Sequence, residues 1–187
     1  GTPNFRPIAG DWDGNGTGTI GIYDTGTGTF FLKNSNAGGA ADLVFGFGPA
    51  AATPLAGDFD GNGSDTIGIY LPATGTFFLK NSNAGGGADL AFQFGPSASS
   101  FVPLLGDWDG NGTDTVGLYD PATGNFFLRN SNTPGAANLV FSFGAGGAGF
   151  VPVTGDWNND GVDSVGIYAP STGAFFVHEC APERLAD

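Results

Sequence analysis

Four copies of one pattern run through the 187-residue chain, and this repetition restricts the folds open to it more than any other feature. Each copy contains Gly-Asp, an aromatic residue and then Asp or Asn. The copies begin at Gly10, Gly57, Gly106 and Gly155, which are 47, 49 and 49 residues apart. Repeats of this length belong to arrays in which each unit buries its apolar faces against its neighbours. We therefore interpret residues 1–187 as a single repeat domain. Its units are 1–53, 54–100, 101–149 and an incomplete 150–180, followed by a C-terminal tail, 181–187.

Each repeat contains short segments in which apolar residues alternate with others, the pattern of a β-strand. In the third copy these segments are Val102–Gly106, Thr115–Tyr119, Asn125–Asn130 and Asn138–Phe143. A Pro-Ala-Thr-Gly turn after Asp120 separates the second segment from the third, with Pro fixing φ and Gly supplying a positive φ. Four antiparallel strands in about 48 residues match the size of a propeller blade. We therefore predict an all-β fold, a β-propeller of four blades.

The fourth repeat differs from the others at its end. In the first three copies the last strand ends in Phe-x-Phe followed by Gly, within residues 42–47, 89–94 and 138–143. The fourth copy continues instead into 177–187, which contains no such segment. We therefore predict that the last blade lacks its outer strand. Either the repeat is simply truncated there, or another chain completes the open edge, because an unpaired strand edge is a template for pairing.

Acidic residues concentrate in a loop that recurs between the first and second strands of every repeat. Counted from its first Asp, the second loop has oxygen-bearing side chains at positions 1, 3 and 5, Gly at position 6, and at position 7 a Ser whose carbonyl can also bind a metal. Oxygen donors at alternate positions of a tight turn suit Ca²⁺, a hard cation with many oxygen ligands. The candidate metal ligands are Asp11, Asp13, Asn15, Thr17 and Thr19 in the first loop; Asp58, Asp60, Asn62, Ser64, Asp65 and Thr66 in the second; Asp107, Asp109, Asn111, Thr113, Asp114 and Thr115 in the third; and Asp156, Asn158, Asp160, Val162, Asp163 and Ser164 in the fourth.

The expected cofactor is therefore Ca²⁺, up to four ions with one per repeat. Eleven of the eighteen acidic residues lie in the four loops, and without a cation each cluster would repel itself. The first loop lacks the acid at position 8 and should bind most weakly. The alternative is that the Asp-Gly-Asn-Gly strings only form turns. No loop has Glu at position 12, so we expect an affinity near the ~10⁻⁴–10⁻³ M of extracellular modules, and hence an extracellular or cell-surface location.

Charge and composition exclude several classes of function. The net charge of −13, with only five Lys and Arg, argues against nucleic acid as a partner, because its phosphates must be neutralised by cations. No apolar run approaches the roughly 18 residues of a membrane span, so membrane insertion is not expected. Cys180 is the one cysteine, and an odd cysteine in a secreted chain suggests an intermolecular disulfide. His178, Glu179 and Cys180 have no uniquely placed Ser or Asp beside them, so we predict that the chain is not an enzyme.

A cationic residue or histidine follows the Phe-Phe-Leu or Phe-Phe-Val segment of the third strand in every repeat. These four candidate positions for a ligand or partner are Lys33, Lys80, Arg129 and His178. A row of such positions would suit an anionic sugar or a carboxylate, whereas the simpler interpretation is a solvent-facing strand residue near an acidic neighbour. The Trp and Tyr residues that recur in the repeats would either stack on sugars or pack between blades.

Three features together resemble the FG-GAP/VCBS-type repeats of bacterial surface proteins and, more distantly, the integrin α-chain propeller. They are Phe-Gly near the repeat end, a Pro-containing strand, and then a loop of the form Asp-x-Asp-Gly-Asn-Gly. The resemblance extends to about Val177, and it implies a β-propeller with calcium in the loop between strands 1 and 2 of each blade. The family loop usually has Asp at position 9, where this chain has Thr19, Thr66, Thr115 and Ser164.

We therefore expect a calcium-binding extracellular β-propeller that serves in structure, adhesion or surface display. One alternative is a carbohydrate-binding lectin that uses the recurrent aromatic and cationic residues. Another is a self-assembling subunit of an extracellular filament or oligomer, in which a neighbour completes the open edge of the fourth blade. The expected partner is a surface protein, a glycan or a second copy of the chain.

Overall fold

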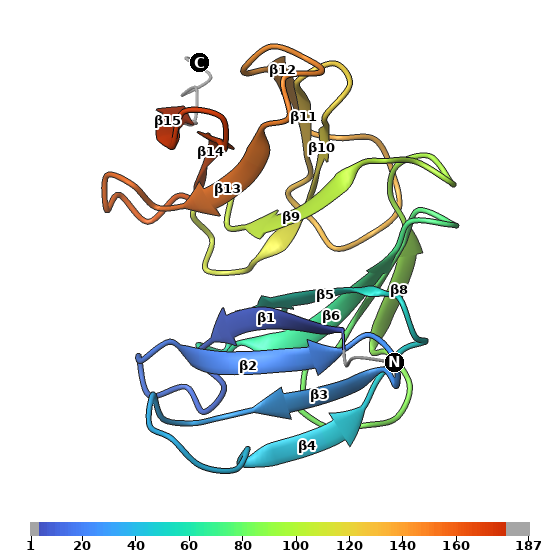
Figure 1. Ribbon diagram of the computed structural model, residues 1–187, viewed down its shortest axis with the longest axis vertical. Coiled ribbons are helices and arrows are strands. Elements are labelled where there is room, and N and C mark those ends of the chain that lie inside the picture. Colours follow the sequence, from blue (N-terminus) through green and yellow to red (C-terminus); the bar gives the residue numbers. More distant parts are fainter. Residues whose placement is uncertain (1–3, 179–187) are drawn as a thin grey trace. The chain divides into compact units, whose positions relative to one another are not determined.

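The computed structural model describes residues 4–178 (Figure 1). This part of the chain forms fifteen β-strands and no helix, and so it has no helix that is long and apolar enough to cross a membrane. The strands form four antiparallel sheets. The chain divides into two compact units, residues 1–99 and 100–187, and each unit contains two of the sheets.

The first unit contains two four-stranded sheets, and in both the strands lie in sequence order. The first sheet consists of β1 (Phe5–Gly10), β2 (Thr19–Asp24), β3 (Thr29–Leu32) and β4 (Leu43–Gly46). The second consists of β5 (Thr53–Gly57), β6 (Thr66–Leu71), β7 (Thr76–Leu79) and β8 (Leu90–Gln93). Each sheet is a simple up-and-down meander, which is the topology of a propeller blade.

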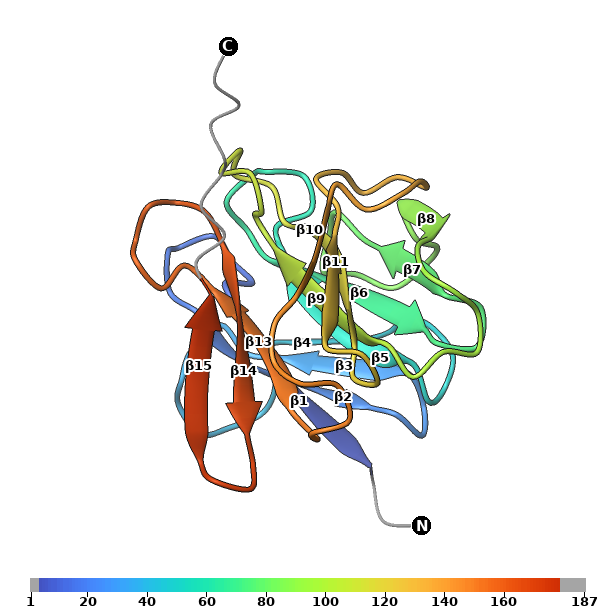
Figure 2. The ribbon, with the colours of Figure 1, turned by 90° about the horizontal axis from the view of Figure 1, so that it is seen from above.

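The second unit contains a four-stranded sheet followed by a three-stranded one. The third sheet consists of β9 (Val102–Gly106), β10 (Thr115–Asp120), β11 (Asn125–Leu128) and β12 (Leu139–Ser142). The fourth consists of β13 (Val151–Gly155), β14 (Ser164–Ala169) and β15 (Ala174–His178). Figure 2 shows β15 beside β14 at the edge of this last sheet.

The hairpin between the second and third strands of a blade forms as the sequence indicates. In the third sheet the N–H of Gly124 donates to the carbonyl of Asp120 (2.8 Å), and the Asp120 side chain accepts the N–H of Ala122 (2.9 Å). Gly124 has φ +78°, and a Cβ there would lie 2.5 Å from the carbonyl oxygen of Gly144. This turn therefore needs glycine both for its backbone conformation and for its close approach to the segment after β12.

Each blade has two faces, because successive side chains of a strand point to opposite sides of the sheet. We call one of them the forward face; in the first blade it carries Tyr23, Phe30 and Leu32, all fully buried. This face packs against the opposite, or backward, face of the second blade, where Ile67 and Ile69 belong to the same apolar cluster. The core of the first unit thus lies between its two blades.

The second unit is built on the same principle. Its forward-face residues Tyr119, Phe126 and Leu128, on the third blade, share an apolar cluster with Val165 and Ile167 on the backward face of the fourth. In both units, therefore, the forward face of one blade packs on the backward face of the next.

The predicted fold class is confirmed: the chain is all-β, with four blades of the β-propeller type. Within the part that the structure describes, the fourth blade has three strands and lacks the outer one, as predicted. The outer strand normally covers a ring of the third strand; in the first blade, Phe45 stacks on Phe30 with ring centroids 5.9 Å apart. Phe175, which corresponds to Phe30, is 65% exposed.

Candidate functional site in the aspartate loops

All four aspartate loops connect the first and second strands of their blades, and all are closed in the same way. The carboxylate at position 1 accepts the N–H groups of positions 5 and 6. In the second loop Asn62 (3.0 Å) and Gly63 (2.7 Å) donate to Asp58. The same pairs of hydrogen bonds occur at Asp11, Asp107 and Asp156. Each loop is therefore folded around its first carboxylate, which satisfies backbone groups that a short turn leaves unpaired.

The side chain at position 5 fixes the next part of the loop. Its oxygen accepts the N–H of position 7, as from Ser64 to Asn62 (2.8 Å), and Thr17 and Thr113 donate in the same way. In the last loop Asp160 takes this place and accepts the N–H of Val162 (2.9 Å). The exchange of Asp and Asn between positions 3 and 5 thus preserves the loop's hydrogen bonding.

The hydroxyl groups at position 9 are used inside the blades. Thr66 is buried, and its Oγ1 donates to the carbonyls of Gly57 (3.3 Å) and Lys80 (2.6 Å). The other residues at this position, Thr19, Thr115 and Ser164, are buried as well. The Thr19 and Thr115 hydroxyls also donate to the first strands of their blades, at the carbonyls of Gly10 (3.2 Å) and Gly106 (3.3 Å), so these threonines help to hold neighbouring strands together.

The acid at position 8 joins the loops of neighbouring blades. In the first unit the Asp65 carboxylate accepts the N–H of Asp11 (2.7 Å), and the Asp65 N–H donates to the carbonyl of Asp11 (2.8 Å). Asp163 and Asp107 form the same reciprocal pair in the second unit, at 2.9 and 2.8 Å. We call each pair an interloop clasp. The position-8 carboxylate of one loop is therefore a hydrogen-bond acceptor for the backbone of the loop in the preceding blade.

A second set of interactions at these loops comes from residues to which the sequence analysis gave no role. Asn83 Nδ2 donates to the carbonyl of Asp65 (2.8 Å), and Asn132 Nδ2 donates to that of Asp114 (2.8 Å). Both residues belong to the Asn-Ser-Asn segments that follow the third strands. The recurrence of this segment in three repeats is the signal that could have identified them.

The carboxyl groups of the two residues that form the clasp in the first unit have pKa values shifted in opposite directions. Burial alone would raise the pKa of Asp11, but the N–H groups of Gly16 and Asn15 stabilise its carboxylate, and the pKa is lowered. Burial raises the pKa of Asp65, and the negative charges of Asp11 and Asp58 add to the rise against the opposing hydrogen bond from the Asp11 N–H.

The second unit repeats these electrostatics. Burial raises the pKa of Asp163, with further contributions from the charges of Asp107 and Asp156. Burial and the charge of Asp107 also raise the pKa of Asp109, whereas the N–H of Gly161 lowers that of Asp156 despite its desolvation. Carboxyl groups of two loops are thus close enough to repel one another, an environment that favours a nearby cation.

The donor set is suited to a hard cation, although with few charges. Within residues 4–178, no three His, Cys, Asp or Glu side chains are grouped closely enough to form a metal site by themselves. A Ca²⁺ ion at one loop would therefore be held by the carboxylates of positions 1 and 3, the side-chain oxygen of position 5 and the carbonyl of position 7. All of these are oxygen donors, and their low charge agrees with a weak site of the extracellular type.

The two lysines of the predicted cationic row are engaged in contacts with their surroundings. Lys80 is buried, with its Nζ 3.8 Å from Asp89 Oδ2 and 5.7 Å from the ring centre of Phe47 in the preceding blade. Lys33 has the equivalent ion pair with Asp42 (3.8 Å). Both lysines thus form ion pairs within their own blades, and Lys80 also packs against the preceding blade.

The other two positions of that row have similar roles. Arg129 donates to the carbonyls of Thr133 (2.6 Å) and Pro134 (2.9 Å) in the loop that follows its strand. His178 stacks on Phe141, with ring centroids 5.1 Å apart, and meets Phe143 edge-on at 5.2 Å. Cys180, beyond it, lies outside the described residues, so the intermolecular disulfide remains a prediction.

The recurrent aromatic side chains are divided between the interior and the surface. Trp12, Trp108, Tyr23, Tyr70 and Tyr119 are buried, which favours the interpretation that they pack within and between blades. Trp157, in the last loop, is 44% exposed. Of the three Trp residues, it is the one whose ring is open to solvent.

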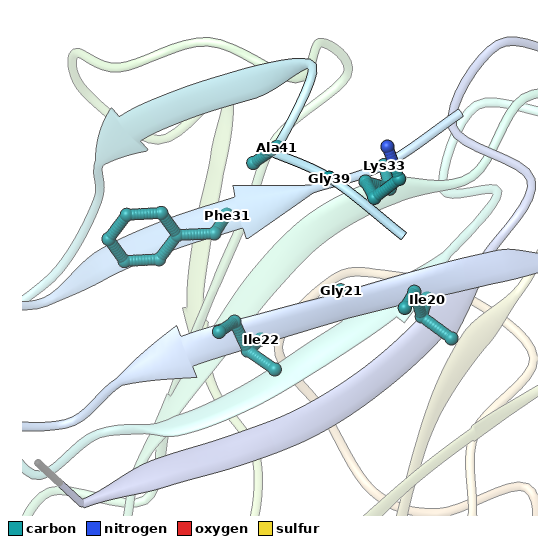
Figure 3. Close-up of a pocket in the computed structure, with 7 residues that line it drawn as sticks. All are labelled: Ile20, Gly21, Ile22, Phe31, Lys33, Gly39 and Ala41. Atoms are coloured by element: carbon teal, nitrogen blue, oxygen red, sulfur yellow. The ribbon is translucent and has the colours of Figure 1, made fainter. Parts of the chain in front are cut away.

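A shallow, mainly apolar pocket of about 220 Å³ lies on the backward face of the first blade. Figure 3 shows Ile20 and Ile22 on β2 and Phe31 on β3, with Lys33 at one end of the pocket. The remaining lining residues are Gly21, Gly39 and Ala41. This pocket differs from the acidic loops in its chemistry, since its lining is mainly apolar and its charged residue is Lys33.

The fold is similar to that of a solved lectin. Neither a family model nor a curated protein matches the chain. Among solved structures, the chain resembles a lectin from Agrocybe aegerita that is described as recognising non-reducing terminal N-acetylglucosamine. The TM-score is 0.61 at 18% sequence identity, and the match covers 97% of this chain but 53% of the lectin chain. The chain therefore spans about half the length of that lectin, and a similarity at this identity concerns the fold alone.

Proposed function

We propose that the chain is a calcium-binding β-propeller module of the FG-GAP/VCBS type, located outside the cell and serving in structure, adhesion or surface display. The observation that carries the proposal is the identical construction of four acidic loops around the position-1 carboxylate. One acidic turn needs no metal, but four equivalent turns that concentrate negative charge favour a shared cation chemistry.

Calcium would act through residues that already connect the blades. Bound at positions 1 and 3, it would offset the repulsion that Asp65 experiences from Asp11 and Asp58. Ordering one loop would then also order its neighbour through the interloop clasp. In this clasp the Asp65 carboxylate accepts the Asp11 N–H, and the Asp65 N–H donates to the Asp11 carbonyl. The proposed role is thus a scaffold whose rigidity depends on calcium, with no catalytic step. A weak affinity would fill such sites only where calcium reaches millimolar levels, as outside the cell.

Calcium titration by calorimetry on EDTA-treated protein tests this proposal, with the thermal midpoint followed in parallel. We expect three to four ions to bind, the first loop most weakly, and the midpoint to rise. Asp60→Asn and Asp109→Asn should each remove or weaken one site. Asp42→Asn is the matched control, because Asp42 pairs with Lys33 outside the loops. No binding up to several millimolar Ca²⁺ would show that the loops are only turns.

A lectin function is the second candidate, and the similarity to a solved lectin favours it. Trp157 is the exposed ring on which a sugar could stack, since Trp12 and Trp108 are buried. Retention on a glycan array that includes terminal N-acetylglucosamine, lost in Trp157→Ala, would support it. An absence of retention on every glycan would exclude this candidate.

A further inference from the structure

Each of the first three aspartate loops has an Asn-Gly pair at positions 5 and 6, and the sequence contains no other such pair. The asparagines are Asn15, Asn62 and Asn111, and all three are exposed. In an Asn-Gly pair the main-chain nitrogen of glycine can attack the side-chain amide carbon of asparagine, because glycine has no Cβ to hinder the approach. The loops therefore carry a residue pair that is open to deamidation.

The asparagine side chain in each loop is folded back over its own backbone. Asn62 Oδ1 accepts the N–H of Ser64, two residues further along the chain (2.8 Å), and the same bond occurs in the first and third loops (2.9 Å in both). A side chain held in such an Asx turn brings its amide carbon towards the nitrogen of the intervening glycine. The two atoms that would join are thus neighbours in the folded loop.

The carboxylate at position 1 holds the nitrogen that would attack. In the second loop the N–H of Gly63 donates to Asp58 Oδ2 (2.7 Å), and the equivalent distances in the first and third loops are 2.6 and 2.7 Å. This hydrogen bond must break before the nitrogen can lose its proton and turn towards the amide carbon. The reaction therefore proceeds from a locally opened loop, whose population depends on the free energy of closing the loop.

The fourth loop shows that the product of deamidation fits the same turn. Its position 5 is Asp160, followed by Gly161. Asp160 Oδ1 accepts the N–H of Val162 (2.9 Å), and Gly161 donates to Asp156 (2.9 Å), as in the asparagine loops. Asp160 Oδ2, which stands in place of an amide nitrogen, accepts from Asn158 Nδ2 (3.0 Å). A closed loop is thus compatible with aspartate at position 5.

We propose that Asn15, Asn62 and Asn111 are sites of spontaneous deamidation, and that closure of each loop by its position-1 carboxylate controls the rate. The glycine nitrogen bonds to the amide carbon Cγ, the Cγ–Nδ2 bond breaks, and the proton from the glycine nitrogen leaves with Nδ2 as ammonia. Water then opens the resulting succinimide ring. Cleavage of the new Cγ–N bond gives aspartate, and cleavage of the original peptide bond gives isoaspartate. One water is consumed, one ammonia is released, and nothing is oxidised or reduced.

Conversion to aspartate would change how the loop interacts with a cation. In the fourth loop Asn158 donates to the carboxylate at position 5, but position 3 is Asp in the first three loops. A converted loop would therefore contain three carboxylates, which repel one another without a cation and bind Ca²⁺ more tightly. This consequence rests on the proposed function, whereas the conversion itself does not.

Incubation of the folded full chain in EDTA, followed by peptide mapping with mass spectrometry, tests the proposal. The three sites should convert, whereas Asn138, which precedes Leu139, should stay unchanged over the same period. Asp58→Ala removes both hydrogen bonds that close the second loop. Asn62 should then convert about tenfold faster, because opening the loop no longer breaks these bonds. The sites of the first and third loops should keep their wild-type rates.

A second variant in the other compact unit repeats the comparison. Asp107→Ala should accelerate conversion at Asn111 alone, because Asp107 closes the third loop in the same way. Circular dichroism verifies that both variants fold. An absence of conversion at the three sites in the wild type would overturn the proposal. An equal change at all three sites in either variant, or no change at the altered loop, would also overturn it.

A defined substitution tests the consequence for calcium. Asn62→Asp should lower the thermal midpoint in EDTA and bind one Ca²⁺ about tenfold more tightly than the wild type in calorimetry. Asn138→Asp is the matched control, since it adds the same charge where Asp42 and Asp89 stand in the first two blades. Calcium binding without conversion would overturn this inference and leave the proposed function standing. Conversion without any calcium binding would uphold the inference and contradict the proposed function.

Discussion

Asp65 and Asp163 accept a hydrogen bond from a neighbouring loop while facing that loop's negative charge. The hydrogen bond favours the ionised form, whereas burial and the nearby carboxylates disfavour it. Burial and repulsion outweigh the bond at both residues, because the pKa is raised in each. The native state therefore binds protons at these sites more readily than the unfolded chain does, and ionisation at neutral pH opposes folding.

A pH dependence follows for Asp65, whose native pKa lies above the ordinary 3.8. Its favourable contribution is complete below 3.8 and is lost as the pH rises through the raised native value. Asp65→Asn keeps an oxygen that can accept the Asp11 N–H but cannot ionise. In EDTA, urea unfolding should therefore show the wild type losing stability relative to Asp65→Asn as the pH rises towards neutrality. Asp11→Asn should give the opposite slope, because the native pKa of Asp11 is lowered. A flat difference for Asp65→Asn would contradict this account.

Residue types and spacing predicted that the loops hold oxygen donors, but not which contacts each donor makes. The clasp of Asp65 joins it to a residue 54 positions away, and no local pattern reports such a contact. Thr66 illustrates the same limit, since its hydroxyl donates to the carbonyls of Gly57, at the end of β5, and Lys80, just after β7. The sequence shows which residues carry oxygen atoms, whereas the packing of neighbouring strands and blades determines which groups those oxygens contact.

At the scale of strands, alternation and turn residues predicted the elements, including β10 to within one residue of its end. The predicted third strand of that blade, Asn125–Asn130, is shorter in the structure and ends at Leu128. Burial could not be predicted locally. The segments 19–23 and 66–70 are both Thr-Ile-Gly-Ile-Tyr, yet the two isoleucines are exposed in the first and buried in the second. The difference arises from the neighbouring blade, which local sequence does not encode.

The hairpin glycines provide a test at this scale. Gly124→Ala should destabilise the chain by more than the ~1–2 kcal/mol of a left-handed residue, because the new Cβ would also meet the carbonyl of Gly144. Gly147 has a similar φ of +73°, and nothing lies within 4 Å of an added Cβ there. Gly147→Ala should therefore lower the stability only by the cost of a left-handed backbone conformation. Urea unfolding of both variants measures the difference. Equal losses would mean that the contact with Gly144 relaxes without cost.

For the whole molecule, the repeat length predicted four all-β blades. The absence of Phe-x-Phe-Gly from the last repeat predicted the three-stranded last blade found among residues 4–178. The division into two compact units had no counterpart in the sequence, because the nearly constant spacing of the repeats marks no boundary after the second one.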